Sequence, residues 1–406
     1  MAYTETTSTS YGQRLAGSAK GMIGGLLMFI IGTCLLWWNE GRTVRTAKAI
    51  GDAASHVESV ADVSKIDASL NGKLIHASAF ADTKDTLTDD MFGVRELAIR
   101  LDRKVEYYQW VENAQTRERE KIGGGKETTT TYTYEQKWVD KPVNSAEFKD
   151  PQYQSANKVL SEVEERNEMA QHVTFGAYTL PESFVASISG SEPVEVRMTE
   201  EQRFTWNERL HMLRPKVNTE TSLVHTSANT VYLGLSPNSP QVGDVRVTFT
   251  KVPPADISLI AQVDGSTFKV YRAKNGQSFS RVQMGTVSAD EMIEQARSEN
   301  NMLTWVLRLV GVLLIVIGLK GMFGLLPMLF KVLPFLGSIV DAGVGLVSWI
   351  FGLAWSLIII AIAWLIFRPI IGISLLVLAI AGIVFLKKQA AKRKAAQANA
   401  PAAPQA

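Results

Sequence analysis

The chain has 406 residues, of which 42 are Lys or Arg and 40 are Asp or Glu, giving a formal net charge of +2. This balance argues against a nucleic-acid-binding protein, whose phosphate contacts demand a basic surplus. The single cysteine, Cys34, excludes both an intramolecular disulfide and a cysteine-based zinc site.

Charge is distributed unevenly along the chain. The first 20 residues form a Ser/Thr-rich leader for which the composition predicts disorder. No charged residue occurs between Lys20 and Glu40, a run that matches the roughly 20 residues with which a helix crosses a bilayer. We interpret residues 21–38 as a retained transmembrane helix and not as a signal peptide, because the run is long and ends in Trp37 and Trp38.

Residues 39–301 form a polar region in which strand patterns predominate. Residues 105–119 and 126–139 alternate on either side of a glycine turn at 123–125, which predicts a hairpin. Residues 257–284, with Asp-Gly and Asn-Gly turns, predict a three-stranded meander. The spacing of apolar residues over 155–170 predicts an amphipathic helix. GVR at 93–95 and GDVR at 243–246 each begin a strand, which suggests the hypothesis of two related halves.

Three further apolar segments follow. Ser288 and Glu291 predict a helix start, and this helix continues into a second span at residues 302–319. The prolines and charges of residues 321–342 favour an interfacial or re-entrant segment. Residues 343–367 and 370–386 predict the third and fourth spans, and residues 387–406 form a basic, Ala/Pro-rich tail. The fold class is therefore a membrane protein in which one N-terminal and three C-terminal helices flank a large, strand-rich α+β domain.

The charges beside the spans predict an orientation. Five basic residues and no acidic one follow the last span, which places the tail in the cytoplasm. Four spans return the N-terminus to that side, in agreement with Arg14 and Lys20, although Arg42, Arg45 and Lys48 oppose it. The central domain is then expected in a periplasm or an organelle lumen.

Five motifs occur in an order that resembles the LUMA family, also called transmembrane protein 43. They are Asn39-Glu40-Gly41-Arg42, VEYYQWVE at 105–112, VGDVRVTF at 242–249, TWVLRLVG at 304–311 and WLIFRP at 364–369. The resemblance covers nearly the whole chain and implies four spans with a large lumenal domain. It also implies a membrane-organising scaffold that self-associates and binds other membrane proteins, with no catalytic residues to transfer.

The resemblance implies a location that depends on the source of the chain. The Ala/Pro-rich tail favours a bacterial member, whose location would be the inner membrane. A eukaryotic member would lie in the endoplasmic reticulum or nuclear envelope.

Two groups of residues are candidate sites. Arg308, Lys331 and Asp341 lie in the membrane region, where ionised side chains are costly, so they are candidates for an intramembrane polar or lipid-contact site in which Asp341 pairs with Lys331 or Arg308. The alternative is that these charges reach the interface along flexible side chains.

The second group is Gly17, Gly21 and Gly25. These residues form overlapping GxxxG patterns, which are a candidate helix-packing face. Chance is the alternative explanation, because glycine is frequent in membrane helices.

No familiar catalytic, cofactor-binding or metal-binding motif is present, and the five histidines lack metal-ligand spacing. We expect no catalytic residues, no cofactor and no metal. The function that fits best is an integral membrane scaffold with membrane lipids, a second copy of itself and other membrane proteins as partners, and with no nucleic acid. The alternative is a membrane-associated enzyme or lipid-handling protein with a site where the domain meets the bilayer.

Overall fold

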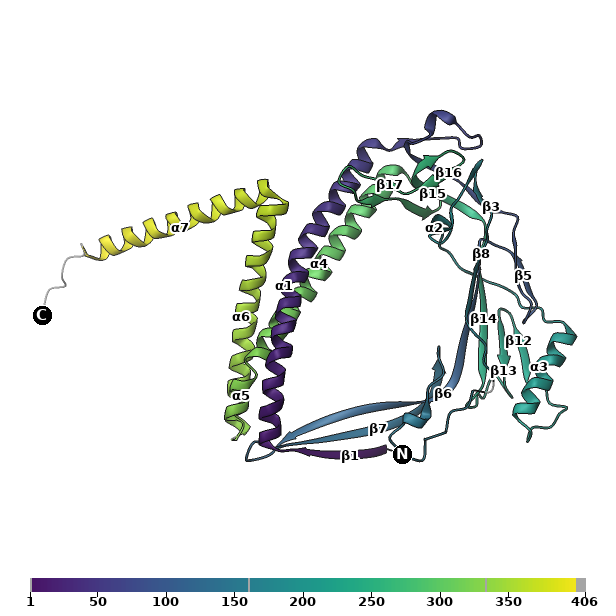
Figure 1. The fold of residues 1–406 in the computed structure, drawn as a ribbon, viewed down its shortest axis with the longest axis horizontal. Helices are drawn as coiled ribbons and strands as arrows, with labels where there is room; N and C mark the ends of the chain where they lie inside the picture. The colour runs from purple at the N-terminus through teal and green to yellow at the C-terminus, as the bar shows by residue number, and fades with distance from the viewer. Residues whose placement is uncertain (1, 160, 333, 399–406) are drawn as a thin grey trace, which may run out of the picture. The chain divides into compact units, whose positions relative to one another are not determined.

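The computed structural model describes residues 2–159, 161–332 and 334–398 (Figure 1). The chain forms two compact units. The strand unit comprises residues 1–9, 49–120 and 126–296, and the helical unit comprises residues 10–48, 121–125 and 297–406. The last part of the predicted tail, residues 399–406, lies outside the described residues.

Five helices contribute to the helical unit: α1 (Tyr11–His56), α4 (Ala289–Met322), α5 (Leu325–Phe330), α6 (Pro334–Phe367) and α7 (Pro369–Ala398). Within the described residues, four segments are long and apolar enough to cross a membrane, namely Tyr11–His56, Ala289–Phe330, Phe335–Phe367 and Pro369–Ala390. This confirms the predicted class, with one N-terminal and three C-terminal membrane helices flanking a strand-rich region.

The segment at 321–342, expected to be interfacial or re-entrant, is divided among three helices. It contains the end of α4, all of α5 and the first turns of α6. Pro327 is the third residue of α5 and Pro334 is the first residue of α6. Proline is tolerated in the first turn of a helix, where its missing N–H has no intrahelical acceptor, so both positions fit.

The larger sheet of the strand unit has eight strands, in the order β1-β7-β6-β14-β13-β12, with β8 paired to β6 and β11 to β14. The strands are β1 (Ala2–Thr9), β6 (Arg100–Glu120), β7 (Lys126–Val139), β8 (Arg166–Met169), β11 (Glu192–Pro193), β12 (Val224–Ser227), β13 (Thr230–Leu233) and β14 (Val245–Val252).

The hairpin predicted across the glycine turn is confirmed. Strands β6 and β7 pair antiparallel from Tyr107 opposite Val139 to Glu120 opposite Lys126. The leader, in contrast, is not disordered: all eight residues of β1 pair with β7, with Thr6 opposite Thr129. β-branched residues fill both strands, and such residues favour the extended conformation. The composition of the leader cannot reveal this pairing, because the partner strand lies more than 100 residues away.

The second sheet has seven strands, in the order β19-β15-β16-β10-β9-β3-β2, and it closes on itself because β15 also pairs with β3. The strands are β2 (Glu58–Ser59), β3 (Leu74–Thr83), β9 (Val173–Phe175), β10 (Tyr178–Thr179), β15 (Ala255–Asp264), β16 (Thr267–Lys269) and β19 (Arg281–Met284). Its interior is an apolar core that includes Phe175, Tyr178 and Phe268.

The predicted meander is present with a different order. Strand β19 pairs with β15 and not with the strand between them. The chain around the Asn275-Gly276 turn forms a separate hairpin of β17 (Tyr271–Arg272) and β18 (Ser278–Phe279). A further hairpin joins β4 (Thr86–Asp89) to β5 (Val94–Leu97). Gly93 and Gly243 both adopt positive φ, 68° and 97°, before the strands that carry the repeated motif. Whether these mark two related halves stays a prediction.

The prediction of a helix over residues 155–170 is wrong. This segment has no helix among its described residues, and it ends in β8, which pairs with β6. Pairing with a neighbouring strand overrides the local helical spacing. The helices of the strand unit are instead α2 (Glu182–Val185) and α3 (Glu200–Leu213), with short 3₁₀ turns at Ala68–Leu70 and Ser145–Glu147. Thr199 and Gln202 form a complete capping box at the start of α3.

The strand unit also contains the last turns of α1 and the first turns of α4. Ile50 and Ala53 of α1 and Met292, Ile293 and Ala296 of α4 pack in one apolar cluster with Leu74 and Ile260 of strands β3 and β15. Both ends of the strand unit therefore continue directly into membrane helices.

Candidate functional site

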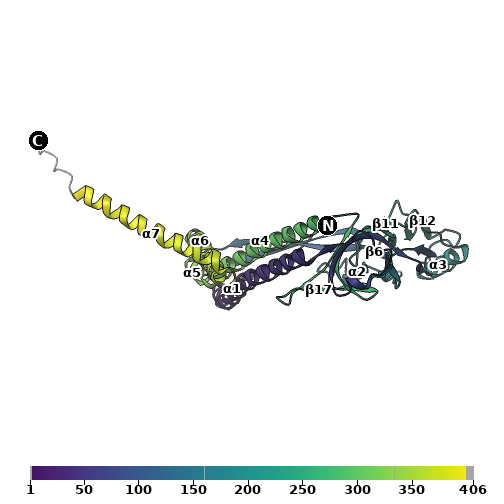
Figure 2. The same ribbon diagram turned by 90° about the horizontal axis from the view of Figure 1, so that it is seen from above.

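Helices α1 and α4 contact each other along four glycines, which we call the glycine seam: Gly25 and Gly32 on α1, and Gly311 and Gly318 on α4. A Cβ atom at Gly25 would lie 2.6 Å from the carbonyl oxygen of Gly318, and one at Gly32 would lie 2.9 Å from that of Gly311. The backbones are thus in direct contact, and the pairing shows that the helices run antiparallel. Figure 2 shows them side by side.

The seam differs from the predicted packing face. Of Gly17, Gly21 and Gly25, only Gly25 has α4 atoms against its own Cβ position, whereas a Cβ at Gly17 or Gly21 would have no atom within 4 Å. In each helix the seam glycines are seven residues apart, or about two turns, which keeps them on one face. This seven-residue spacing is visible in the sequence and is the signal that would have located the seam.

The seam continues into four polar residues, the polar layer: Asn39, Thr43, Asn300 and Thr304. Asn39 Nδ2 donates to the Thr304 carbonyl oxygen (3.0 Å), and the two threonine hydroxyls are 2.7 Å apart. Asn300 Nδ2 donates to the Thr43 carbonyl oxygen (3.2 Å). All four residues are buried. Because each finds partners on the opposite helix, burial does not leave its polar atoms unsatisfied.

Next to this layer, an ion pair between Glu40 of α1 and Arg308 of α4 is joined by Trp364 of α6. We call these three residues the clamp, because they connect three helices. Arg308 Nε donates to Glu40 Oε1 (2.6 Å), and its Nη2 donates to Oε2 (2.9 Å). The Trp364 indole N–H also donates to Oε2 (2.8 Å). The Glu40 side chain has 0% exposure and that of Arg308 has 13%.

Aromatic rings complete the clamp. The Arg308 guanidinium carbon lies 4.8 Å from the ring centroid of Trp305 and 5.7 Å from that of Trp364. A bidentate carboxylate and two ring faces offset the cost of burying this cation. Glu40 uses both oxygens for hydrogen bonds within the bundle, so the clamp is suited to joining helices and not to binding a substrate.

Helix α6 packs beside α1 and runs parallel to it. The Trp355 indole donates to Thr33 Oγ1 (3.0 Å), and the rings of Trp37 and Phe367 lie 5.7 Å apart. At Gly41, a Cβ atom would lie 2.9 Å from the Phe367 ring. Residue numbers at these contacts increase along both helices, which shows that the two helices are parallel. Because α4 also contacts α1, the helices α1, α4 and α6 form one bundle.

The structure separates Arg308 from Asp341, two of the three charged residues predicted to share a site. Arg308 is in the clamp, whereas Asp341 is paired with Lys320 at 3.4 Å and both side chains are about half exposed. Lys331 caps the end of α5 through its backbone N–H, and its side chain lies beside Gly337. Arg308 and Lys320 are separated by 12 residues of one helix, or about 18 Å. The prediction missed Glu40, the partner of Arg308, although Glu40 belongs to the first motif of the family resemblance.

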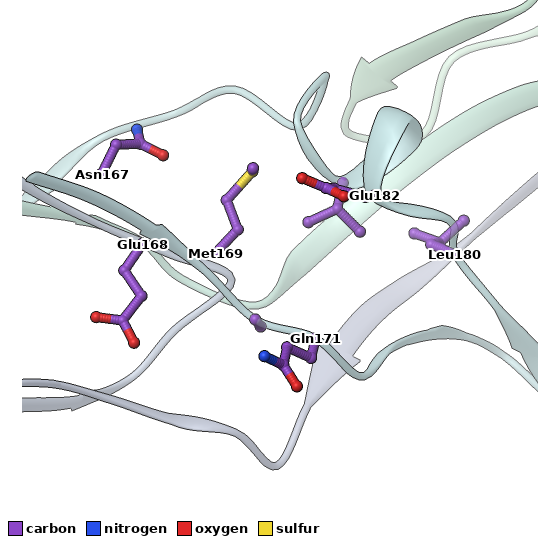
Figure 3. Close-up of a pocket in the computed structure, with 8 residues that line it drawn as sticks. Asn167, Glu168, Met169, Gln171, Leu180 and Glu182 are labelled. Atoms are coloured by element: carbon purple, nitrogen blue, oxygen red, sulfur yellow. The ribbon is translucent and has the colours of Figure 1, made fainter.

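A polar pocket of about 530 Å³ lies in the strand unit. Figure 3 shows Asn167, Glu168, Gln171 and Glu182 among its lining residues. Glu168 is paired with Arg166 at 2.7 Å, so one of the two carboxylates is already neutralised. No group of three or more His, Cys, Asp or Glu within the described ranges could hold a metal ion.

A second buried charge lies in the VGDVRVTF motif. Asp244 has 0% exposure and accepts hydrogen bonds from Arg214, from the Tyr232 hydroxyl and from the Gln241 N–H (2.8 Å). Burial, together with the hydrogen bond to Asp244, raises the pKa of Tyr232 well above its ordinary value. Every polar atom of Asp244 faces the protein, so this residue stabilises the larger sheet.

These features define a multi-pass membrane protein in which a bundle of antiparallel and parallel helices is continuous with a strand-rich unit. The sequence matches the family described as Transmembrane protein 43 over residues 107–369, and the chain belongs to this family. It is 27% identical to Transmembrane protein 43 of Rattus norvegicus over 392 residues, which cover 94% of this chain and 93% of the relative.

Other relatives agree. The Homo sapiens Transmembrane protein 43 is 26% identical with the same coverage, and the Drosophila melanogaster homolog is 28% identical over 87% of this chain and 90% of its own length. No solved structure matches the chain. The family predicted from five short motifs is thus confirmed, and three of these motifs supply Glu40, Arg308 and Trp364 of the clamp.

Proposed function

We propose that the protein is a membrane scaffold, which presents its strand unit at the bilayer surface for self-association and for recruiting other membrane proteins. The observation that carries the proposal is the double anchor. Both ends of the strand unit continue into α1 and α4, and these helices are joined by the glycine seam and the clamp. Such an anchor restricts the distance of the strand unit from the membrane, as a scaffold requires.

Helix α3 supports partner recruitment. Phe204 and Met212 are eight residues apart on one helical face and are 65% and 75% exposed. Exposed apolar side chains that lie together on one face are typical of protein interaction surfaces, whereas single ones are ordinary. On the opposite face, Trp206 and Leu210 are buried in the core of the larger sheet, so α3 is firmly held while its outer face stays accessible.

Native mass spectrometry of the full chain in mild detergent tests the scaffold. We expect a defined oligomer for the wild type, and a shift toward monomer for the Phe204→Ser/Met212→Ser variant without a change in its melting temperature. Ile66→Ser is the matched control, because Ile66 is 51% exposed elsewhere in the strand unit. A wild-type monomer that recovers no membrane protein from its native membrane would contradict the proposal.

We also propose that the basic C-terminal tail faces the cytoplasm. Four spans would then leave the strand unit in the periplasm of a bacterium, or in the lumen of the endoplasmic reticulum or nuclear envelope of a eukaryote. Charge and strand pairing favour opposite sides for the N-terminus. Arg14 and Lys20 favour the cytoplasm, whereas β1, which precedes α1, pairs with β7, which follows it. Cysteine cross-linking of β1 to β7 separates these arrangements.

A further inference from the structure

An apolar groove lies where the glycine seam ends. We call it the basal groove, and its lining residues are Met22, Ile23 and Leu26 of α1, and Met322, Phe323, Leu325 and Leu326 at the end of α4 and in α5. Its volume is about 570 Å³, within the range of about 300–1,000 Å³ that ligand pockets have.

The glycines explain why the groove exists. A Cβ atom at Gly25 would lie within 3 Å of the backbone of Gly318 and Gly321, so the two backbones are in direct contact there. Helix α4 then ends at Met322, and the chain turns at Gly324 into α5. The groove residues at this end of the two helices have large side chains, so the helices cannot approach there as closely as at the glycines. An open space therefore remains between α1 and the end of α4.

Two lysines share helical faces with the groove residues. Lys20 lies three residues before Ile23 on α1, and Lys320 lies three residues before Phe323 on α4, a spacing that places side chains on the same face. Lys320 is about half exposed, and its pairing with Asp341 at 3.4 Å is a surface ion pair that a stronger anion can replace.

The parts of the helical unit at this end carry a positive surplus. Residues 10–25 and 318–342 together contain Arg14, Lys20, Lys320 and Lys331, against Asp341 as the one acidic residue. Basic sites between membrane helices bind acidic lipid headgroups. An apolar groove beside such charges fits a ligand with a long hydrocarbon chain and a negative head.

We propose that the basal groove binds an acyl chain of an anionic phospholipid, whose phosphate is held by Lys20 and Lys320. The hydrocarbon chain fills the space between α1 and α5, and the phosphate lies between the two lysines, which reach it along their flexible side chains. A zwitterionic phospholipid offers the same chains without the net negative charge, so it binds more weakly. The site is independent of the scaffold function, because a chain that recruits no partner could still hold the lipid.

Native mass spectrometry with phosphatidylglycerol and phosphatidylcholine of identical acyl chains, added in equal amounts to the full-length protein, tests the site. We expect the wild type to retain phosphatidylglycerol preferentially. The Lys20→Gln/Lys320→Gln variant should lose this preference, with affinity for phosphatidylglycerol lowered about 30-fold. Leu26→Trp, which fills the groove, should reduce the binding of both lipids.

Two controls separate this site from general lipid contact. Lys387→Gln/Lys388→Gln removes the same charge outside the groove, and Leu357→Trp adds the same bulk at a position of α6 that is 65% exposed. Both should retain wild-type binding, and circular dichroism should show that all variants are folded. Equal losses in variants and controls, or displacement of the lipid by millimolar inorganic phosphate, would overturn the proposal.

Discussion

The ion pair of the clamp gives the sharpest prediction for stability. Arg308→Met removes two hydrogen bonds to a carboxylate that has 0% exposure. Each hydrogen bond to a charged group contributes about 1.5–3 kcal/mol, so two contribute about 3–6 kcal/mol. Breaking a buried ion pair by removing one partner typically costs about 3–5 kcal/mol, which is consistent with that range. We therefore expect Arg308→Met to lower the free energy of unfolding by about 3–5 kcal/mol.

The cost arises mainly from the carboxylate that is left behind. Removing both charges with Glu40→Met/Arg308→Met should consequently be less damaging than Arg308→Met alone, because apolar side chains of similar size replace a buried ion pair at little cost. Reversible unfolding in mixed micelles, applied to a double-mutant cycle, measures this coupling. Single-variant losses below about 1 kcal/mol that add up in the double variant would refute a buried pair.

The remaining predictions concern the seam, the leader and the strand unit. Gly318→Leu should lower the melting temperature in detergent because its side chain would meet the backbone of α1, whereas Gly24→Leu, where a Cβ meets no atom within 4 Å, should not; equal effects would contradict the seam. In a Cys34→Ser background, Thr6→Cys/Thr129→Cys should form a disulfide in membranes, since the two positions pair in register; failure to form it would support the N-terminal location predicted from charge. Backbone N–H groups of His172 and Gln171 donate to Asp85 and lower its pKa, so this carboxylate stabilises the fold above its ordinary pKa of 3.8 and loses the effect as pH falls. The melting-temperature difference between wild type and Asp85→Asn should accordingly be largest at neutral pH and shrink below about pH 4; a constant difference would exclude this role.

The sequence predicts the membrane helices well because the relevant signal is local. Uncharged runs of about 20 residues, bounded by charges or prolines, are typical of spans, and the second span is interrupted only by Arg308. The β6–β7 hairpin is equally local, since both strands and their glycine turn lie within 40 residues. The family resemblance succeeds for a different reason, as it combines five weak motifs in a fixed order.

Features that depend on distant partners are harder to predict. Arg308 is noticed as a charge in an apolar segment, but its partner, Glu40, lies 268 residues away, and no local pattern connects them. The helix predicted over 155–170 fails for a related reason, because β6 supplies a strand partner for residues 166–169. The disorder predicted for the leader neglects β7 in the same way. In all three cases the missing information is which distant segment lies alongside.

The central claim is that α1 and α4 form one antiparallel pair within the membrane. The measurement that tests it most directly is copper-catalysed cross-linking of Leu36→Cys/Gly311→Cys in a Cys34→Ser background, in native membranes. A Cβ at Gly311 would lie 2.6 Å from Leu36 Cδ2, so shortening Leu36 to cysteine brings the two sulfur atoms within bonding reach. We predict that this pair forms a disulfide, whereas Leu36→Cys/Gly318→Cys, displaced by about 10 Å along α4, does not. Cross-linking of the displaced pair instead, or of neither pair, would contradict the claim.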